Sequence, residues 1–270
     1  MKNKIVNGFD EAVADVFDGA FIAFSTFGTA SQAMNLWEAI YNKDVKDLTV
    51  MGNMVMSPRG EITNMTVFGA SHCVMQPGKV KRVITGFTSG VYTAMADSKK
   101  DEFSPALEKC EVIATTFGNI CTHLEAGAAG YGGILTPVGV GTFFEEKMDK
   151  YVIDGKEYLL IKPIVPDFGF VKAQKADKLG NLYYRRGQRV HNPLVAAASK
   201  ITIAEVIEIV EPGEIDPDHI HTPHIYVDRI VKIPKGGKGT PEWDEVTKAL
   251  SYAPGGPERS RMAAMPGRGS

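Results

Sequence analysis

The amino-acid sequence predicts one α/β domain, with a mostly parallel sheet flanked by helices and a β-rich second half. In the first half, short apolar runs alternate with segments of helical periodicity, which is typical of parallel strands joined by helices. In the second half, tight turns join apolar runs directly, as in hairpins. The chain has 270 residues, of which 44% are hydrophobic, and this is enough for a full core.

Four apolar runs are the strands expected in the first half: Ala20 to Phe24, Leu48 to Met51, Val80 to Thr85 and Glu111 to Thr115. The segment Ser31 to Tyr41 is expected to be helical, since Ala33, Leu36, Trp37 and Ile40 share one helical face. Two further helices are expected at Asp101 to Lys109 and at Ile120 to Ala126.

Turn residues define the elements of the second half. Asp154-Gly155 is a good hairpin turn between Lys150 to Val152 and Glu157 to Ile161. Leu179-Gly180-Asn181 is a second turn, between Phe168 to Lys175 and Leu182 to Arg185. The remaining expected elements are a short helix at Val195 to Ser199 and β-rich segments at Ile201 to Ile209 and Ile225 to Lys232.

No linker long enough to divide the chain into two domains interrupts residues 1–235, which we expect to form one unit. After Lys235 the sequence becomes rich in Gly, Pro and charge. Within residues 236–270, Trp243 to Ser251 is expected to form one peripheral helix, and Gly255 to Ser270 is expected to be disordered.

Composition excludes several classes of partner. The formal net charge is −2, from 30 Lys and Arg against 32 Asp and Glu, which gives no electrostatic case for binding nucleic acid or an anionic membrane. Cys73, Cys110 and Cys121 are scattered and odd in number, which indicates a reducing compartment. With no apolar run long enough to span a membrane and no apolar signal core at the N-terminus, the sequence predicts a soluble cytoplasmic protein.

The strongest local signal for function lies between Asp18 and Ala33. An apolar strand ends there in Ser25-Thr26-Phe27-Gly28, and a helix begins a few residues later. Small residues let a ligand approach the backbone closely, and amide hydrogens beside a helix N-terminus suit an anion or a developing oxyanion. The alternative is an ordinary strand-to-helix loop.

This segment resembles the signature of the α-type subunits of family I coenzyme A (CoA) transferases, the group that includes 3-oxoacid and acetate CoA-transferases. That signature runs Asp/Asn-Gly, two residues, three apolar residues, Gly-Gly-Phe, three residues, Gly, one residue and Pro. This chain has Asp18-Gly19, Ile22-Ala23-Phe24 and Phe27 at matching positions. It departs at four positions, which carry Ser25, Thr26, Ser31 and Ala33.

Further blocks resemble the same family, in the same order, up to about Lys235. The resemblance implies the NagB/RpiA/CoA transferase-like fold. The blocks are Leu48-Thr49 with Gly52-Asn53, Gly127 to Gly130, Thr136 to Thr142, Lys175 to Leu182, Glu208 to Gly213, Ile220 to Pro223 and Val227 to Ile230.

The resemblance also implies a binding site for CoA, which is a substrate rather than a permanently bound cofactor. The backbone of Phe27 and Gly28 would support an oxyanion. The implied CoA-binding residues are Ser25, Thr26, Phe27, Gly28, Thr29, Ala30 and Ser31.

The implied acyl pocket contains Asn53, Phe117 and Gly118. Related α-type chains carry Pro-Gln-Gly after the strand that matches Glu111 to Thr115, and their Gln contacts the acyl substrate. Here Phe117 places a ring where those chains have an amide. We therefore expect apolar or aromatic acyl groups to fit better than 3-oxo groups.

The family reaction needs a glutamate nucleophile, which belongs to a Ser-Glu-Asn-Gly motif of the β subunit. This chain has no such motif, and its counterpart is Met51-Gly52-Asn53-Met54. Glu61, Glu125, Glu145 and Glu146 lack that context. The resemblance thus implies half of a ping-pong enzyme, which assembles with a β subunit into α2β2 or a larger oligomer.

Two other functions stay open. On the same fold, a subunit of a CoA-thioester hydrolase or of a carbon-carbon lyase would fit equally. A regulator that binds a sugar phosphate would need no partner, but it usually carries a DNA-binding segment, and no basic helix-turn-helix is visible. A metal site at His219, His221 and His224 is not expected, since Pro217 and Pro223 break any helical face.

Overall fold

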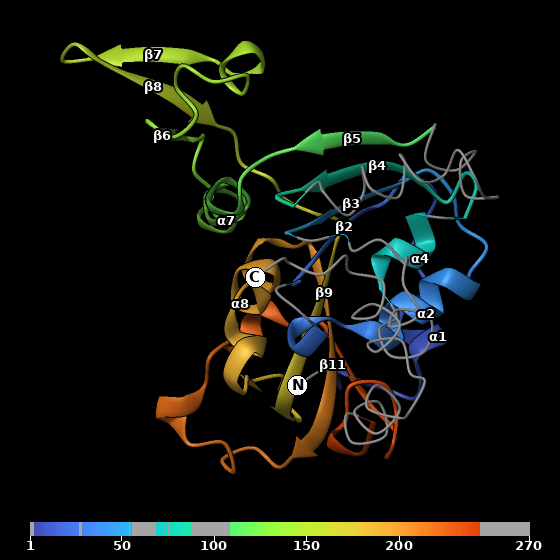
Figure 1. The fold of residues 1–270 in the computed structure, drawn as a ribbon. Coiled ribbons are helices and arrows are strands. Elements are labelled where there is room, and N and C mark those ends of the chain that lie inside the picture. Colours follow the sequence, from blue (N-terminus) through green and yellow to red (C-terminus); the bar gives the residue numbers. More distant parts are fainter. Residues whose placement is uncertain are drawn as a thin grey trace, which may run out of the picture.

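A nine-stranded sheet forms the centre of the computed structural model, which describes residues 3–26, 29–53, 55, 69–74, 76–87 and 109–243. The strand order is β1-β12-β11-β9-β2-β3-β4-β5, and β10 pairs with β9 outside this row (Figure 1). Every pair in the row is parallel, and only the β9–β10 pair is antiparallel. The strands are β1 Ile5–Val6, β2 Phe21–Phe24, β3 Leu48–Gly52, β4 Val80–Thr85, β5 Glu111–Ala114, β9 Phe168–Asp177, β10 Leu182–Tyr183, β11 Ile201–Val210 and β12 Arg229–Lys232.

Helices cover both faces of the sheet (Figure 1). Helices α1, α2 and α4 pack on one face, and α7 and α8 pack together on the other. The α-helices are α1 Phe9–Ala12, α2 Met34–Asn42, α4 Ala70–Val74, α7 Phe117–Ala129 and α8 Asn192–Ala198. The 3-10 helices are η1 Thr29–Ser31, η3 Glu145–Lys147, η4 Arg186–Arg189, η5 Pro217–His219 and η6 His224–Tyr226.

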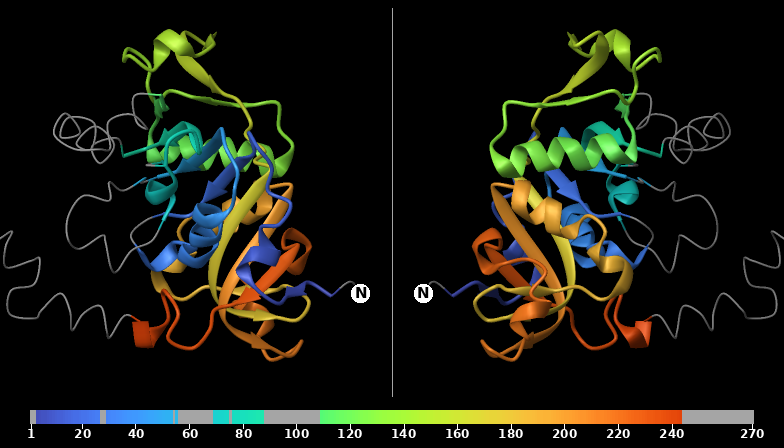
Figure 2. Two further views of the ribbon diagram at one scale, coloured as in Figure 1. Left: turned by 90° about the vertical axis from the view of Figure 1, so that its right-hand side faces the viewer. Right: turned by 90° about the vertical axis from the view of Figure 1, so that its left-hand side faces the viewer.

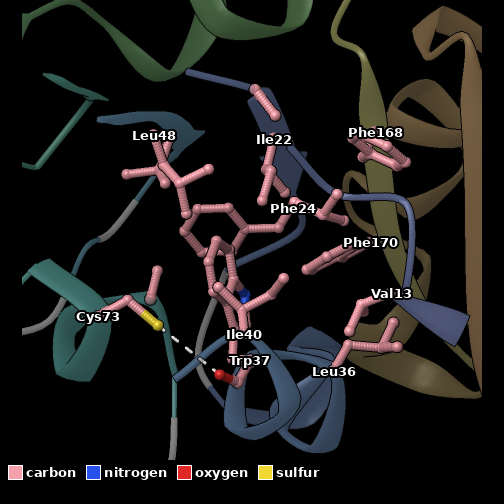
Figure 3. Packing of buried hydrophobic residues seen from close by; sticks show 14 of the residues in the cluster. Val13, Ile22, Phe24, Leu36, Trp37, Ile40, Leu48, Cys73, Phe168 and Phe170 are labelled. Carbon is pink, nitrogen blue, oxygen red and sulfur yellow. Dashed lines mark hydrogen bonds between the residues drawn. The ribbon is translucent and has the colours of Figure 1, made fainter. Parts of the chain in front are cut away.

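Trp37 of α2 lies at the centre of the larger hydrophobic core. Its ring meets Phe24 of β2 edge-on at 4.8 Å between centroids, and Phe170 of β9 at 5.3 Å (Figure 3). All three side chains are buried. Because successive strand residues point to opposite faces, Ile22 and Phe24 join this core while Ala23 joins the core under α7 and α8. The predicted helical face thus packs on the sheet as expected, although the α-helix begins at Met34 and not at Ser31.

A second, three-stranded antiparallel sheet follows α7. It comprises β6 Ile134–Thr136, β7 Lys150–Ile153 and β8 Lys156–Ile161 in the order β6-β8-β7, and it stands apart from the main sheet (Figure 2). Asp154 and Gly155 join β7 to β8 with φ of 50° and 75°. Positive φ at both central residues gives the twist that a two-residue hairpin requires, so the predicted turn is confirmed.

The predicted fold class is confirmed, and most strands agree with their predicted positions. Residues 80–85 agree at both ends. The runs at 20–24, 48–51, 111–115, 168–175 and 201–209 each coincide with a strand whose ends lie within two residues of the predicted ones. The segment 225–232 was expected to be β-rich throughout, but residues 224–226 form η6 and the strand begins at Arg229. The expected helix at 101–109 and the segment 244–270 lie outside the described residues, apart from Lys109.

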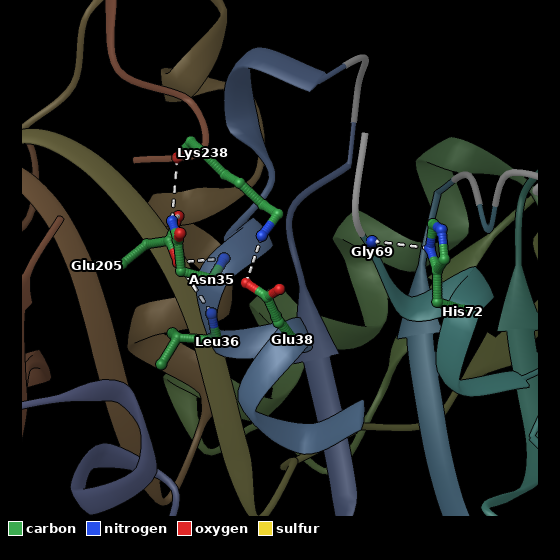
Figure 4. A network of polar contacts seen from close by, with 7 residues as sticks. All are labelled: Asn35, Leu36, Glu38, Gly69, His72, Glu205 and Lys238. Atoms are coloured by element: carbon green, nitrogen blue, oxygen red, sulfur yellow. Dashed lines mark hydrogen bonds and ion pairs between the residues drawn. The ribbon is translucent and has the colours of Figure 1, made fainter. Parts of the chain in front are cut away.

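A buried polar network anchors the start of α2 (Figure 4). The carboxylate of Glu205, on β11, accepts hydrogen bonds from the backbone amides of Asn35 and Leu36 at 3.0 and 3.1 Å. Asn35 also donates its side-chain amide to the carbonyl of Lys238, whose ammonium group pairs with Glu38. These contacts connect the segment after β12 to the helix that carries Trp37.

Candidate active site

The carboxyl ends of four parallel strands bring the predicted site segments to one edge of the sheet. Strand β2 leads into Ser25, β3 into Asn53, β4 into Gly86 and β5 into Thr115. Strands β2 and β9 are neighbours in the sheet. After β2 the chain adds β3, β4 and β5 toward one edge of the sheet, and after β9 it adds β11 and β12 toward the other edge. In open α/β sheets, ligands bind outside the carboxyl ends at such a point of reversal.

Hydrogen bonds hold the ends of β3, β4 and β5 together. The carbonyl of Asn53 accepts from Thr85 Oγ1 at 3.0 Å and from the amide of Phe87 at 2.8 Å. The amide of Thr115 donates to the carbonyl of Thr85 at 3.0 Å. Asn53 is buried, and these bonds fix its backbone at the edge where the sequence places the acyl pocket.

Gly86 allows Asn53 and Phe117 to approach each other. A Cβ atom at Gly86 would lie 2.7 Å from Oδ1 of Asn53 and 3.1 Å from the backbone nitrogen of Phe117. Any side chain at this position would displace Asn53 or Phe117. A glycine is therefore required because there is no room for a side chain, and not because of its backbone angles. The structure therefore brings two of the three predicted pocket residues together.

Helix α7 begins at Phe117, whereas the sequence predicted a start at Ile120. Thr116 is the reason, since its Oγ1 accepts a hydrogen bond from the amide of Asn119 at 3.0 Å and caps the helix. Phe117 and Gly118 thus lie in the first turn of a helix rather than in a loop. A helix N-terminus carries partial positive charge, which suits a carboxylate or thioester oxygen.

Helix α7 continues past its predicted end at Ala126 and into the block Gly127 to Gly130. Gly127 lies inside the helix, and a Cβ atom there would lie 2.1 Å from the carbonyl oxygen of Ile164. Gly130 is the left-handed C-cap, with φ of 69°. Gly127 thus allows α7 to pack closely on the chain after β8, and Gly130 ends the helix.

The predicted CoA loop is described in part. Ser25 and Thr26 are buried directly after β2, whereas Thr29, Ala30 and Ser31 form η1, in which Ala30 is exposed and Ser31 is buried. The methyl group of Thr26 packs against Gly52, where a Cβ atom would lie 2.8 Å away. Phe27 and Gly28 lie outside the described residues, so their role in supporting an oxyanion stays a prediction.

His191 lies beside this site, although no sequence pattern indicated it. Its ring centroid is 4.5 Å from that of Phe117, and the residue is 1% exposed. Burial lowers its pKa, which keeps the imidazole neutral at pH 7. Among the described residues, neither ring nitrogen has a hydrogen-bond partner.

The next residue, Asn192, contacts the loop predicted to bind CoA. Its side-chain amide donates to the carbonyls of Ser31, Lys172 and Gln188 at 3.2, 3.0 and 2.6 Å, and its oxygen accepts from the amide of Lys172. Helix η4 therefore packs on η1. Only the tertiary structure could reveal this, because the contacts join segments distant in sequence.

Strand β3 ends at Gly52, and the next residue, Asn53, offers an amide rather than a carboxylate. Among the acidic residues considered from the sequence, Glu145 lies in η3 and pairs with Lys150 at 2.6 Å, and Glu125 lies on α7. Glu61 lies outside the described residues. Within the described part of the chain, no group of three His, Cys, Asp or Glu residues could hold a metal ion. No helix there is long and apolar enough to cross a membrane.

Comparison with known proteins places this geometry among characterised enzymes. Residues 6–233 match the family model described as Coenzyme A transferase. The A-type subunit of succinyl-CoA:3-ketoacid coenzyme A transferase from Helicobacter pylori is 36% identical over 230 residues, which cover 85% of this chain and 92% of the relative. The A-type subunit of 3-oxoadipate CoA-transferase from Acinetobacter baylyi is 34% identical over 233 residues, with 86% and 96% covered.

A solved structure shows the same fold. The acyl-CoA transferase YdiF of Escherichia coli O157:H7, in a thioester complex with CoA, superposes with a TM-score of 0.71 at 20% identity. The match covers 89% of this chain and 49% of the other. The chain thus spans about half the length of that enzyme, whereas it spans nearly all of the separate A-type subunits.

Proposed function

This chain belongs to the coenzyme A transferase family as the A-type subunit of a heteromeric enzyme, and we propose that it moves CoA between an acyl-CoA and a carboxylic acid together with a B-type subunit. The observation that carries the proposal is a family match over residues 6–233 combined with Asn53 at the end of β3, where the chain offers an amide in place of a carboxylate. The partner supplies the glutamate nucleophile.

The proposed reaction proceeds through covalent intermediates on that glutamate. Its carboxylate attacks the acyl-CoA carbonyl and expels CoA thiolate, which leaves a mixed anhydride. The thiolate then attacks the glutamyl carbonyl, releasing the first acid and forming a glutamyl-CoA thioester. A second acid reverses both steps, so CoA is a substrate and no permanently bound cofactor takes part.

Residues of this chain would bind and orient the two substrates. The loop from Ser25 to Ser31 receives CoA, and the backbone amides of Phe27 and Gly28 stabilise the oxyanion. Asn53, Phe117 and Gly118 form the acyl pocket. The approach of both Asn53 and Phe117 to Gly86 and the position of Phe117 at the N-terminus of α7 support this assignment.

The small sheet supports the need for a partner. In the strand register, Leu135 lies opposite Leu160 and Tyr151 lies opposite Tyr158. These four side chains and Ile153 lie on one side of the small sheet. We call this side the open side. Tyr151 and Ile153 are 47% and 46% exposed, whereas Leu159 on the other side is buried. An apolar side of this kind is typical of a protein interface.

Exposed apolar side chains concentrate in the same region of the chain. Of the 14 large hydrophobic residues exposed in the described residues, nine lie between Ile113 and Val165. Because the relatives are A-type subunits of their enzymes, the proposed occupant is the B-type subunit.

Three further assignments belong to this proposal. Residues 1–235 form the catalytic unit, and residues 236–270 form a peripheral segment. The subunits assemble into α2β2 or a larger oligomer, and the enzyme works in the cytoplasm.

Activity of the separate and combined subunits tests the function. The purified chain alone should transfer no CoA from acetyl-CoA or succinyl-CoA to a panel of carboxylic acids. The mixture with the B-type subunit of the same organism should do so at rates typical of enzymes. Replacing the glutamate of the partner's Ser-Glu-Asn-Gly motif with Gln should abolish transfer. Turnover by this chain alone would disprove the need for a partner.

The same assay separates the transferase from the alternative, which is part of a thioester hydrolase or of a lyase. During transfer the total thioester is conserved while CoA changes acid. A hydrolase loses thioester without a second acid, and a lyase produces a shorter acyl-CoA.

A further inference from the structure

His191 is the least expected buried polar residue of the site. A buried polar side chain nearly always has a hydrogen-bond partner, and leaving one unpaired costs about 1–3 kcal/mol. His191 is 1% exposed, yet neither Nδ1 nor Nε2 has a partner in the described part of the chain. A side chain of similar size without nitrogens would avoid that cost, so folding alone does not explain a histidine here.

The surroundings of His191 connect it to both parts of the proposed site. On one side its ring lies against Phe117, which is 39% exposed at the first position of α7. On the other side, Asn192 binds the carbonyl of Ser31 in the CoA loop. His191 therefore contacts the ring proposed for the acyl group, and its neighbour Asn192 contacts the loop proposed for CoA.

A second orphaned group supports a ligand at this edge. Ser25, at the end of β2, is fully buried, and its Oγ also has no hydrogen-bond partner among the residues that the structure describes. Ser25 precedes η1, and His191 directly precedes α8. The side chain of Asn192, in α8, donates a hydrogen bond to the carbonyl of Ser31, in η1. Polar atoms left unpaired at the edge where ligands bind are the groups that a bound substrate would satisfy.

We propose that His191 determines acyl specificity: when Phe117 turns aside, the imidazole donates a hydrogen bond to an oxygen that the acyl group carries beyond its thioester carbonyl. This inference rests on the proposed function and deepens it by naming the substrate class. The preferred acyl group has an apolar body that packs against Phe117 and, beyond its third carbon, an oxo, hydroxy or carboxylate oxygen that reaches His191. A neutral imidazole has one N–H donor, and an oxo, hydroxy or carboxylate oxygen of the acyl group can accept its hydrogen bond.

The test replaces His191 with Phe and, separately, with Leu. The assembled enzyme is assayed with pairs of acids that share one chain length and differ in one oxo, hydroxy or carboxylate group, placed from the fourth carbon to the chain end. The measured quantity is the ratio of kcat/KM for the oxygenated acid to that for the plain alkyl acid. For at least one pair, both variants should lower this ratio tenfold or more, because a site built for a hydrogen bond discriminates strongly.

Thermal unfolding separates specificity from structure. Without substrate, the variants should unfold at the temperature of the wild type or above it, since the unpaired nitrogens are gone. His123→Phe is the matched control, because Nδ1 of His123 contacts the carbonyl of Lys162 at 2.6 Å and the variant loses that bond. It should lower the unfolding temperature and leave the ratio unchanged.

Two results would overturn the inference. One is a ratio that stays unchanged for every pair in both His191 variants. The other is a loss of thermal stability as large as that of His123→Phe with an equal loss of kcat/KM for both acids, which would show a structural histidine. An enzyme whose wild type transfers no CoA would contradict the proposed function instead, so the two failures are distinguishable.

Discussion

Single residues at the ends of β3, β4 and β5 determine how near to each other the residues of the proposed acyl pocket lie. Asn53 and Phe117 approach each other only because Gly86 has no side chain. The ring of Phe117 is neither buried in the core nor fully exposed, since His191 covers one side of it. Each of these residues therefore offers a direct test of the pocket.

Phe117→Gln should change acyl preference. An amide at this position adds a hydrogen-bonding group, so relative activity toward short 3-oxo acids such as acetoacetate should rise. Relative activity toward bulkier apolar acids should fall. The ratio of kcat/KM for the two kinds of acid should move by about tenfold, which is the effect of one good polar contact. An unchanged ratio would place the ring outside the pocket.

Gly86→Ala should reduce turnover of the assembled enzyme more than it reduces stability. The new methyl group would displace Asn53 or the start of α7 by a few tenths of an ångström or more, and small misplacements cost catalysis heavily. We expect a loss of about tenfold to a hundredfold in kcat/KM. Gly132→Ala is the control, because nothing lies within 4 Å of a Cβ atom at Gly132. Equal effects of the two variants would argue against a pocket at Gly86.

At the scale of secondary-structure elements, a carboxylate on one strand holds the start of a helix. Glu205 of β11 is completely buried, and its oxygens accept from the first turn of α2. Burial raises its pKa to about 7, although the charge of Lys172 and the hydrogen bonds act in the opposite direction. The contact between β11 and α2 therefore depends on pH.

Glu205→Gln should remove a pH dependence of stability. Because the folded-state pKa lies above the ordinary value of 4.5, the native state binds the proton more tightly, and the free energy of unfolding falls as pH rises from about 4.5 to about 7. The fall is on the order of 3 kcal/mol and levels off at higher pH. Urea unfolding at pH 5 and pH 8 measures it. Glu208 lies on the same strand as Glu205 and forms an exposed ion pair with Lys175 of β9. Glu208→Gln should therefore keep the full pH dependence of the unfolding free energy.

At the scale of the whole molecule, the described residues of this chain leave the open side of the small sheet without a covering layer. A three-stranded sheet is stable when one side packs against something, and here the loop with Gly139 packs on the side of Leu159. The open side, with Tyr151 and Ile153, is the side that another protein would cover.

Tyr151→Lys should weaken assembly with the B-type subunit. Placing a charge at the centre of an apolar contact should lower affinity tenfold or more, as measured by sedimentation over a concentration series. Val152→Lys is the matched control, because Val152 is 64% exposed on the opposite side of the same strand, across from Glu157. If both variants assemble like the wild type, the partner binds elsewhere.

Local pattern alone determined much of this protein. Turn chemistry at Asp154-Gly155 and the apolar run of residues 80–85 correctly predicted a hairpin and a strand, since both depend on a few adjacent residues. The spacing of Asp18, Gly19 and Phe27, with the blocks that follow, predicted the family, which the comparisons confirmed.

Tertiary structure decided what the site consists of. The cap at Thr116 moved the start of α7 to Phe117, and the order of the strands brought Asn53, Gly86 and Phe117 together. His191 reached the site only because η4 and α8 pack beside η1. Periodicity and turn residues govern neighbours along the chain. Contacts between distant segments depend on the order of strands in the sheet and on how closely two backbones can approach. A local sequence pattern predicts neither of these.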